Sequence, residues 1–309
     1  MVNLNELVTE QRNDSTLELS ELPIDQILKI MNEEDRSVAD VIQGLVPEIH
    51  AAVDKTVESL KNGGRLIYIG AGTSGRLGVL DASECPPTFG VDERQVLSII
   101  AGGDSAFITA VEGAEDDLAQ GAIDLKNNRL TEKDVVVGLT ASGRTPYVIG
   151  ALSYAKETGA ATVSISCNSH SEVSRIADHP IEAVVGPEVL TGSTRLKAGT
   201  AQKMILNMIS TVTMVKLGKA YKNLMTDLSV SNHKLRERAR RIVMLATGAD
   251  YEIVSRVMNE TNDQIKTSIV MINANADLQA ATDALAAADD YVSQAIASLQ
   301  RNSEEQTAP

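Results

Sequence analysis

Five short apolar runs, separated by stretches with helical spacing, dominate the chain between residues 65 and 185. Each run is rich in β-branched residues and bounded by turn residues, which is typical of a strand buried on both faces. Strands that alternate with helices lie parallel and are joined by right-handed crossovers. The pattern therefore predicts an α/β fold, a three-layer sandwich around a five-stranded parallel sheet. The predicted strands are 65–70, 95–101, 134–139, 161–167 and 181–185, and the helices between them are 77–84, 108–125, 146–158 and 172–177.

Segments with helical spacing also flank this region. On the N-terminal side, helices are predicted over 20–34 and 38–60, and Pro47 should kink or split the second one. Strands cease after Thr194, and the helices predicted beyond it are 196–217, 234–246, 250–257, 262–270 and 276–299. The expected organisation is an N-terminal helical segment (1–56), an α/β domain (57–220), a C-terminal helical domain (221–299) and a disordered tail (300–309).

The charge balance limits the partners of the chain. Its 309 residues carry a net charge of −14, and because nucleic acids and anionic membranes both attract basic surfaces, we expect neither as a partner. Cys85 and Cys167 make no disulfide framework and are typical of free thiols in a reducing compartment. The start lacks a basic segment followed by an apolar one, and no apolar run approaches the roughly 18 residues of a membrane span. We therefore expect a cytoplasmic protein, and the scattered histidines predict no metal site.

Two loops of similar sequence follow the first and third predicted strands, GAGTSGR (70–76) and GLTASGR (138–144). Both lie where a strand gives way to a helix, at the edge where open α/β sheets bind ligands. Glycines let the backbone approach an anion closely, and hydroxyls and helix-terminal N–H groups then bind its oxygens. The pair of loops predicts a site for a sugar phosphate.

Two other interpretations of these loops stay open. The first loop also fits the G-x-G-x-x-G dinucleotide fingerprint, which expects an acidic residue about 20 positions further on. The acidic residue after the second strand, Asp104, lies further along and follows two glycines, and the hydroxyl-rich second loop has no place in that scheme. Alternatively, both loops are only tight strand-to-helix turns. The shared Ser-Gly-Arg ending favours the sugar-phosphate interpretation over both.

The pair of loops resembles those of sugar isomerase (SIS) domains, and longer strings are similar to the N-acetylmuramic acid 6-phosphate etherase family. The similarity runs from about residue 7 to the Ala-rich last helix. Its strings are LVTEQRNDST (7–16), LDASECPPTFG (80–90), VEGAEDD (111–117), LTASGRTPYV (139–148) and LTGSTRLKAGTAQK (190–203). Because SIS domains build their sites between subunits, the resemblance, together with the long apolar helices, also suggests a homodimer.

The resemblance implies a carbon–oxygen lyase that works in the recycling of cell-wall amino sugars. Such an enzyme removes D-lactate from the 3-position of N-acetylmuramic acid 6-phosphate and leaves N-acetylglucosamine 6-phosphate. In the open-chain sugar a base removes the hydrogen on carbon 2, which the aldehyde acidifies, while an acid protonates the departing lactyl oxygen. Water then adds at carbon 3. This scheme needs two proton-transfer groups and a phosphate anchor, and no metal or redox cofactor is expected.

By the same resemblance, Glu84 is the proton donor to the departing lactate and Glu115 the base at carbon 2. Glu84 is expected to end the helix 77–84, because Pro86 and Pro87 prevent its continuation, and the negative end of a helix dipole favours a protonated carboxyl. Glu115 lies in the predicted helix 108–125 among other acidic residues, which alone would indicate only a charged helix face.

The expected substrate-binding residues are glycines and polar residues of the two loops and of the start of the long helix: Gly72, Thr73, Ser74, Thr140, Ser142, Gly143, Thr145, Ser193, Thr194 and Lys197. The second loop is expected to hold the phosphate, and the first the sugar hydroxyls or the phosphate edge. Arg76 and Arg144 are either counter-charges or stabilisers of their turns. Lys197 either closes over the sugar or is an ordinary solvated lysine.

Two other functions remain compatible with this fold. An aldose–ketose isomerase would act at carbons 1 and 2 and release no lactate. A non-catalytic sensor would bind a sugar phosphate without turnover, as the related glucokinase regulatory proteins bind fructose phosphates. Such sensors carry a second SIS repeat, for which 309 residues leave too little chain.

Overall fold

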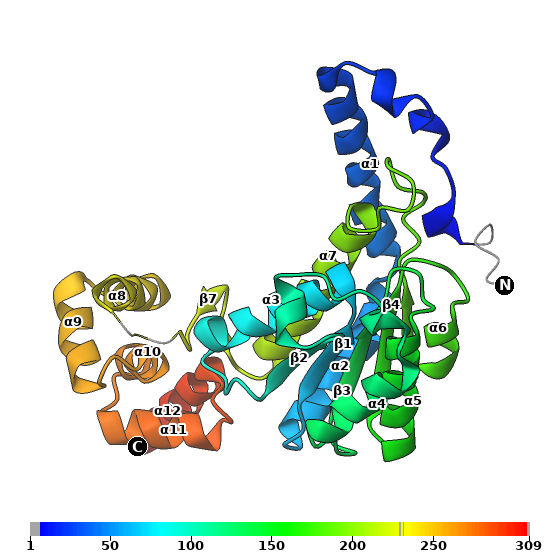
Figure 1. The fold of residues 1–309 in the computed structure, drawn as a ribbon. Helices are drawn as coiled ribbons and strands as arrows, with labels where there is room; N and C mark the ends of the chain where they lie inside the picture. The colour runs from blue at the N-terminus through cyan, green and yellow to red at the C-terminus, as the bar shows by residue number, and fades with distance from the viewer. Residues whose placement is uncertain (1–6, 229, 231, 308–309) are drawn as a thin grey trace. The chain divides into compact units, whose positions relative to one another are not determined.

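The computed structural model describes residues 7–228, 230 and 232–307. The chain forms two compact units (Figure 1). The first contains the residues up to 83 together with 93–211, and the second contains 84–92 together with the residues from 212 on. The second unit thus begins before the predicted boundary near residue 220, and it includes the end of a helix that starts in the first unit.

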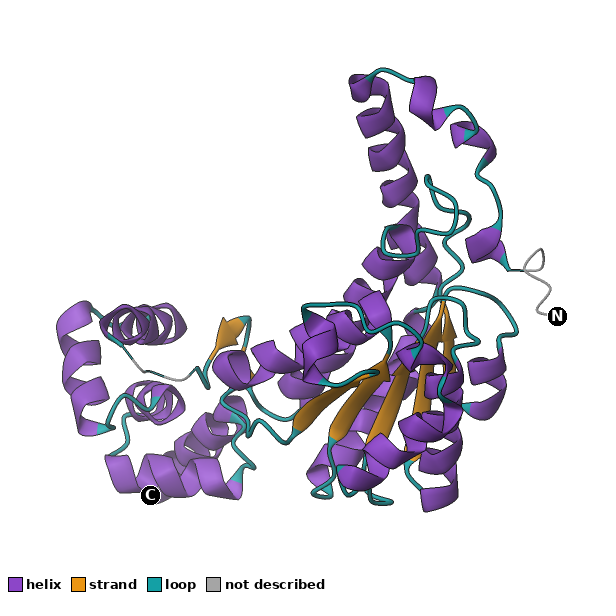
Figure 2. Cartoon of the chain, in the orientation of Figure 1, coloured by secondary structure: helices purple, strands orange, loops and turns teal. Residues whose placement is uncertain are grey.

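A parallel sheet forms the centre of the first unit, as predicted (Figure 2). Its strands lie in the order β2-β1-β3-β4-β5, and their bounds are Leu66–Gly70 (β1), Val96–Ile100 (β2), Val135–Leu139 (β3), Ala161–Ser166 (β4) and His179–Glu182 (β5). The fifth strand begins two residues before the predicted 181–185 and includes Pro180. Because β5 pairs only with β4, a residue without an N–H is tolerated at this edge.

Helices cover both faces of the sheet (Figure 1). α4 (Leu118–Asn127) and α5 (Pro146–Thr158) pack over the face that presents Ile67, Ile69 and Val136. On the other face, α3 (Gly72–Phe89) lies against Tyr68 and Ser98 at Gly78, where a Cβ would approach both side chains within about 3 Å. The remaining helices of this unit are α1 (Ile24–Gly44), α2 (Val46–Lys61), α6 (Glu172–Ile176) and most of α7 (Lys197–Lys216). The three-layer α/β prediction is confirmed.

The N-terminal helices differ from the prediction in where they break. α1 runs through the expected gap at 35–37, and the chain breaks instead at Leu45, just before Pro47. A proline fits the first turn of a helix, where its missing N–H would have no partner anyway. Short 3₁₀ helices, Val8–Glu10, Asp14–Thr16 and Leu19–Glu21, precede α1.

Two of the predicted crossover helices are wrong in extent. α3 continues through Pro86 and Pro87 to Phe89. The φ of proline fits a helix, so the chain tolerates the lost N–H bonds and the crowding of each ring against the carbonyl four residues earlier. The predicted helix 108–125 is largely irregular. It holds a 3₁₀ turn, Ala114–Asp116, that follows Gly113 in left-handed conformation, and α4 begins only after Asp117, whose carboxylate caps it.

Helices of the second unit enclose a separate apolar core that includes Ile242, Val254 and Ile269. Their bounds are His233–Thr247 (α8), Tyr251–Glu260 (α9), Ile265–Ala274 (α10), Leu278–Ala287 (α11) and Val292–Thr307 (α12), and a small hairpin precedes them, Ala220–Tyr221 (β6) with Leu224–Met225 (β7). The predicted helix 276–299 is broken at Asp289 and Asp290, both left-handed. The sequence predicts a disordered tail over residues 300–309, but α12 continues through this stretch and ends at Thr307. In the part of the chain that the structure describes, every helix is too short or too polar to cross a membrane.

The crossing of α4 and α5 gives a test of this packing. A Cβ added at Gly150 would lie 1.8 Å from the carbonyl oxygen of Leu118, and one at Gly121 would lie 2.0 Å from that of Tyr147. We expect Gly150→Ala to lower the free energy of unfolding by about 3 kcal/mol, because two backbones must separate. The measurement is urea unfolding at neutral pH. Gly44→Ala is the control, since nothing lies within 4 Å of its Cβ position. Equal stability of the two variants would contradict the close crossing.

Candidate functional site

The two similar loops start side by side at the carboxyl edge of the sheet. Gly70, the last residue of β1, pairs in register with Leu139, the last residue of β3. The first loop leads into α3 and the second into α5. Parallel pairing of these two strands therefore brings together two sequences that lie 68 positions apart, as the sequence predicts.

In the first loop the hydroxyl of Ser74 is turned toward α7. It donates to Gln202 Oε1 at 2.9 Å and is buried. Gly75 has no room for a side chain, because its Cβ would lie 2.7 Å from the carbonyl oxygen of Gly70. Gly72 is exposed and Thr73 is half-buried. Sequence reasoning missed Gln202, although it stands in the string LTGSTRLKAGTAQK.

The second loop holds a cluster of three hydroxyls. Thr140 Oγ1 lies 2.7 Å from Thr145 Oγ1 and 3.3 Å from Ser142 Oγ. The backbone N–H of Gly143 donates to Thr140 Oγ1, and that of Arg144 donates to Ser142 Oγ. The structure thus brings together the predicted phosphate residues of this loop, with N–H groups and hydroxyls on one short turn.

Glu115 lines a pocket of about 200 Å³ beside the first loop. Gly72 and Arg76 contribute to the same pocket, together with the segment 110–114 that follows β2. The guanidinium of Arg76 is bound within the protein: it donates to the carbonyl oxygens of Ala106 and Phe107, both at 2.9 Å. Of the two interpretations of Arg76, the structure therefore supports the stabiliser of the turn, and it places Glu115 near the predicted site.

Glu84 is exposed and lies on α3. The helix extends to Phe89, so the prediction that Glu84 ends it is wrong, and the helix-terminus argument for a protonated carboxyl does not apply. The rise of a helix puts Glu84 about 15 Å further along α3 than Ser74. Glu84 belongs to the stretch that folds with the second unit, whereas Glu115 belongs to the first.

The start of α7 is fixed by buried charges. Both oxygens of Glu188 accept backbone N–H groups, from Lys197 at 2.9 Å and from Ala198 at 3.0 Å. Burial raises the pKa of Glu188, although these two hydrogen bonds and the Lys197 charge oppose the change. The Lys197 amine is buried and ion-paired with Glu34 of α1. Lys197, expected to face the sugar or solvent, is instead a buried partner of Glu34.

Ser193 and Thr194, the other predicted residues of this segment, are half-buried in the turn before α7. The N–H of Ser193 donates to the carbonyl oxygen of Leu190, and the N–H of Thr194 to that of Gly192. The carbonyl oxygen of Thr194 accepts from Gly199. The structure thus gives this segment a defined turn and assigns no ligand to its hydroxyls.

A buried carboxylate that sequence reasoning missed ties α3 to α7. Asp81 accepts hydrogen bonds from Tyr68 at 2.8 Å, from Asn207 at 2.9 Å and from Ser210 at 3.1 Å. Burial raises the pKa of Asp81, although these hydrogen bonds act in the opposite direction. Together with the Ser74–Gln202 bond, this cluster fixes the position of α3 against its neighbours.

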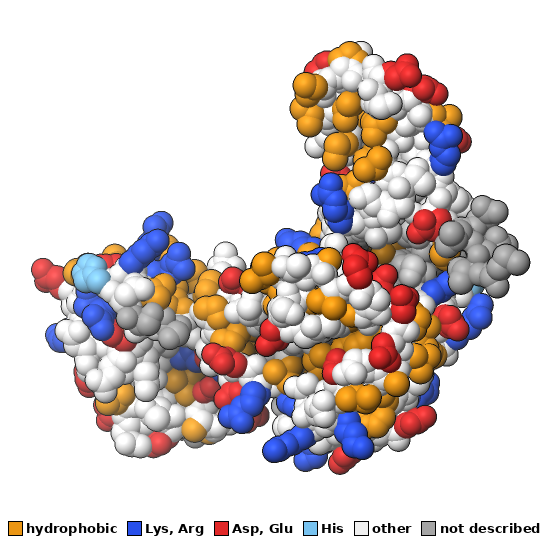
Figure 3. Space-filling model, viewed as in Figure 1, with side chains coloured by type: hydrophobic (Ala, Val, Ile, Leu, Met, Phe, Trp, Pro, Cys, Tyr) orange, Lys and Arg blue, Asp and Glu red, His pale blue; other side chains and the backbone are white. Residues whose placement is uncertain are grey.

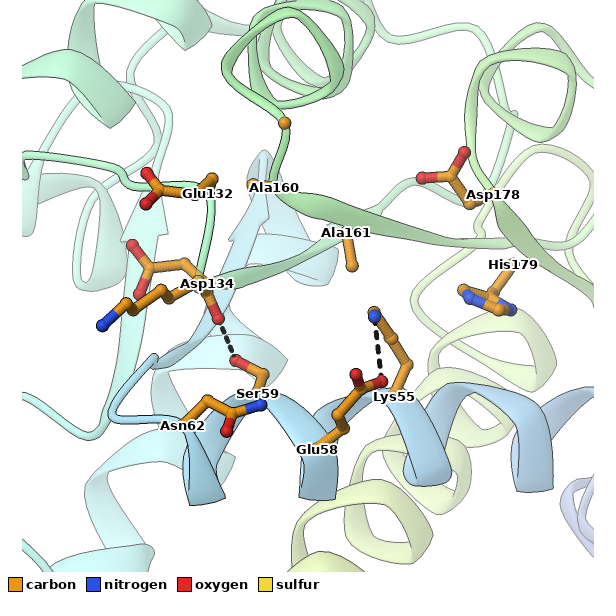
Figure 4. A pocket seen from close by; sticks show the side chains of 12 residues that line it. Lys55, Glu58, Ser59, Asn62, Glu132, Asp134, Ala160, Ala161, Asp178 and His179 are labelled. Atoms are coloured by element: carbon orange, nitrogen blue, oxygen red, sulfur yellow. Dashed lines mark hydrogen bonds and ion pairs between the residues drawn. The ribbon is translucent and has the colours of Figure 1, made fainter.

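Another pocket, of about 660 Å³, lies at the opposite edge of the sheet (Figure 4). Its charges are mixed: Lys55 pairs with Glu58 at 2.9 Å, and Asp134 and Asp178 lie across from them. Ligands of open α/β sheets bind at the other edge, so we place the site at the two loops. Among the described residues, no three His, Cys, Asp or Glu side chains gather as a metal site.

Comparison with known proteins identifies the family. The chain is 58% identical over 268 residues, 87% of its length, to an N-acetylmuramic acid 6-phosphate etherase of Caldanaerobacter subterraneus subsp. tengcongensis, of which it covers 88%. The chain belongs to the N-acetylmuramic acid 6-phosphate etherase family. A second member, from Halalkalibacterium halodurans, is 57% identical over 86% of the chain and 89% of its own length.

Two further matches cover parts of the chain. Residues 48–156 match the model of the glucokinase regulatory protein N-terminal SIS domain. A solved phosphoheptose isomerase from Francisella tularensis is similar over 62% of this chain and 98% of its own, with 19% identity and a TM-score of 0.47.

The Lys197–Glu34 pair predicts a pH-dependent stability. Desolvation opposes the charged form of Glu34, but hydrogen bonds from Lys197, Asn13 and Ser15 outweigh it and lower the pKa of the carboxyl. A lowered folded-state pKa stabilises the protein above the unfolded pKa of about 4.3, and this contribution is lost as the pH falls through the folded-state value.

We therefore expect Glu34→Gln to cost about 2 kcal/mol of unfolding free energy at pH 7, since it leaves a buried ammonium unpaired, and less at pH 3. Urea unfolding at both pH values is the measurement. Asp25→Asn, which breaks the exposed pair with Lys29 on the same helix, is the control and should change stability by less than about 0.5 kcal/mol. A cost for Glu34→Gln that is equal at both pH values would rule out this pair as its source.

Proposed function

We propose that this protein is an N-acetylmuramic acid 6-phosphate etherase: it cleaves the D-lactyl ether of its substrate to give N-acetylglucosamine 6-phosphate and D-lactate. The observation that carries the proposal is the 58% identity to a curated etherase over 87% of the chain. The paired loops at the carboxyl edge of the sheet support it, because they offer hydroxyls and N–H groups to a phosphate. The process served is the recycling of cell-wall amino sugars, in the cytoplasm.

The reaction is an elimination followed by a hydration. A base takes the proton from carbon 2 of the open-chain sugar, the electrons of that C–H bond form the carbon–carbon double bond, and the carbon 3–oxygen bond breaks. The lactyl oxygen leaves with a proton from an acid, and water then adds across the double bond. We assign the base to Glu115, because it lines the pocket beside the first loop, and the acid to Glu84.

In this proposal the second loop holds the phosphate through Thr140, Ser142, Gly143 and Thr145. Gly72 and Thr73 approach the sugar, and Ser74 contributes through its backbone, since its hydroxyl donates to Gln202. Ser193 and Thr194 lie in the segment that closes over the sugar. Lys197 supports the start of α7 and does not contact the substrate directly, since its amine is ion-paired with Glu34.

Turnover in heavy-oxygen water tests this function. Incubation with N-acetylmuramic acid 6-phosphate should place the label in the amino sugar and leave the lactate unlabelled, because the carbon 3–oxygen bond breaks and water replaces that oxygen. Mass spectrometry of both products is the measurement. Label in the lactate would contradict the elimination, and conversion of a hexose phosphate without lactate release would indicate an isomerase. Binding of a sugar phosphate without turnover would support the sensor.

We further propose that the active form is a homodimer in which the two carboxylates of one site come from different chains. The distance of about 15 Å along α3 between Ser74 and Glu84 is long for a single sugar ring, so a Glu84 from a second copy is favoured. Exposed apolar side chains on and near the start of α1, such as Ile24, Leu28 and Leu17, offer a surface for that copy (Figure 3).

Complementation tests the shared site. Glu84→Gln and Glu115→Gln should each reduce lactate release by at least about a hundredfold, the usual contribution of a proton-transfer group. Co-expression of the two variants should restore about a quarter of the wild-type activity, because half of randomly paired dimers are mixed and each mixed dimer has one intact site of two.

Co-expression of Glu115→Gln with the double variant is the control, since no pairing of these chains restores a site that has both carboxylates. If both single variants are inactive and their mixture stays inactive, the carboxylates act within one chain. Near-normal activity of either single variant removes that residue from the mechanism.

A further inference from the structure

The side-chain amide of Asn168 joins the N-terminal segment to the second loop. Asn168 follows β4 and is 3% exposed. Its Nδ2 group donates to the carbonyl oxygens of Ala141 at 3.1 Å and of Ser142 at 3.3 Å, and to Thr9 Oγ1 at 3.0 Å. Its Oδ1 accepts the backbone N–H of Thr9 at 3.4 Å. One buried amide thus contacts two consecutive peptide groups of the loop.

These contacts set the direction of the peptide groups in the loop. The carbonyl of Ala141 also accepts the N–H of Cys167, and the carbonyl of Gly143 accepts that of Val173. Three successive carbonyls, 141 to 143, therefore point toward the segment 167–173. In a trans peptide the N–H of the next residue points the opposite way, so the N–H groups of residues 142 to 144 face away from that segment. They face the side of the loop hydroxyls, since the N–H of Gly143 donates to Thr140 Oγ1 and that of Arg144 to Ser142 Oγ. Successive N–H groups that face one side form an anion-binding concavity.

Thr9 determines which way the amide of Asn168 is turned. With the Thr9 N–H bound to Oδ1, the Nδ2 group must face the loop carbonyls, and a flipped amide would set an oxygen against two oxygens. Thr9 is 1% exposed, so water does not replace it. Thr9, in the string LVTEQRNDST, thus has a structural role beside the second loop.

We propose that Asn168, held by Thr9, is a positioning residue that turns the N–H groups of the second loop toward the phosphate of the substrate. The inference rests on the proposed phosphate role of that loop and assigns no contact between Asn168 and the substrate. Removal of the amide donor releases the carbonyl of Ser142 and leaves that of Ala141 held by Cys167 alone. The peptide between residues 142 and 143 can then turn, while the groups that transfer protons are untouched. The expected effect is therefore on KM and on anion affinity, more than on kcat.

The test compares Asn168→Asp, Thr9→Val and Thr9→Ser in the full-length protein. Asn168→Asp keeps the shape but sets a carboxylate against two carbonyls, and we expect KM for N-acetylmuramic acid 6-phosphate and the inhibition constant of inorganic phosphate both to rise roughly tenfold. Thr9→Val removes only the hydroxyl acceptor and should raise both roughly threefold, and Thr9→Ser should restore them. In each variant kcat should change less than KM.

Thr162→Val is the matched control. Thr162 is equally buried and hydrogen-bonded to Asp178 at 2.8 Å, but it lies near the amino end of β4, away from the loops. It should lower the melting temperature without a change in KM. If Asn168→Asp does not fold, Thr9→Val and Thr9→Ser decide the matter. The inference is overturned if the Asn168 and Thr9 variants change only the melting temperature, as the control does, or lower kcat alone.

Ser142→Ala separates this inference from the assignment on which it rests. An unchanged KM and phosphate inhibition constant in Ser142→Ala would remove the phosphate from the second loop, and both ideas would fail. A raised KM in Ser142→Ala, with wild-type values in Asn168→Asp and Thr9→Val, would overturn the positioning role alone.

Discussion

The parallel pairing of β1 with β3 is the constraint on which the site depends. Gly70 and Leu139 end the two strands in register, so the loops that follow begin about 5 Å apart. Each loop then enters a helix at the same edge of the sheet, and the partial positive charges of both helix starts face the same space. Neither loop alone would distinguish a dinucleotide from a sugar phosphate. Their juxtaposition sets the N–H groups and hydroxyls of the second loop beside the glycine-rich first loop, which suits a compact anion.

The sequence predicts this sheet well because buried strands leave a strong local signal. Four of the five strands lie within one residue of the predicted limits, since β-branched runs bounded by turn residues have few other structures available. The predicted limits are wrong where a local rule competes with tertiary packing. Pro86 and Pro87 do not stop α3, and residues 108–117 form no α-helix because Gly113 turns the chain and Asp117 caps a later start.

The candidate site divides in the same way. Its hydroxyl-bearing loops carry recognisable strings and could be predicted. The groups that hold these loops could not, because each acts across a long separation: Gln202 bonds to Ser74 and Asn168 to Thr9. A single Asn or Gln has no local pattern that reveals its partner. Lys197 shows the same limit: its place in a family string predicts a ligand, but its ion pair with Glu34 could not be foreseen across 163 positions.

A division of labour follows from burial. Asp81 and Glu188, which fix α3 and the start of α7, are almost inaccessible, and so is Asn168, the proposed positioning residue of the second loop. Their hydrogen bonds are made within the fold. They keep the donors of the site in place before any ligand arrives, so ligand binding does not carry the entropic cost of ordering them. The two proposed proton-transfer residues, Glu84 and Glu115, are exposed instead. A rigid, buried frame for the anion combined with accessible carboxylates is the arrangement expected of an enzyme that anchors its substrate at one end and moves protons at the other.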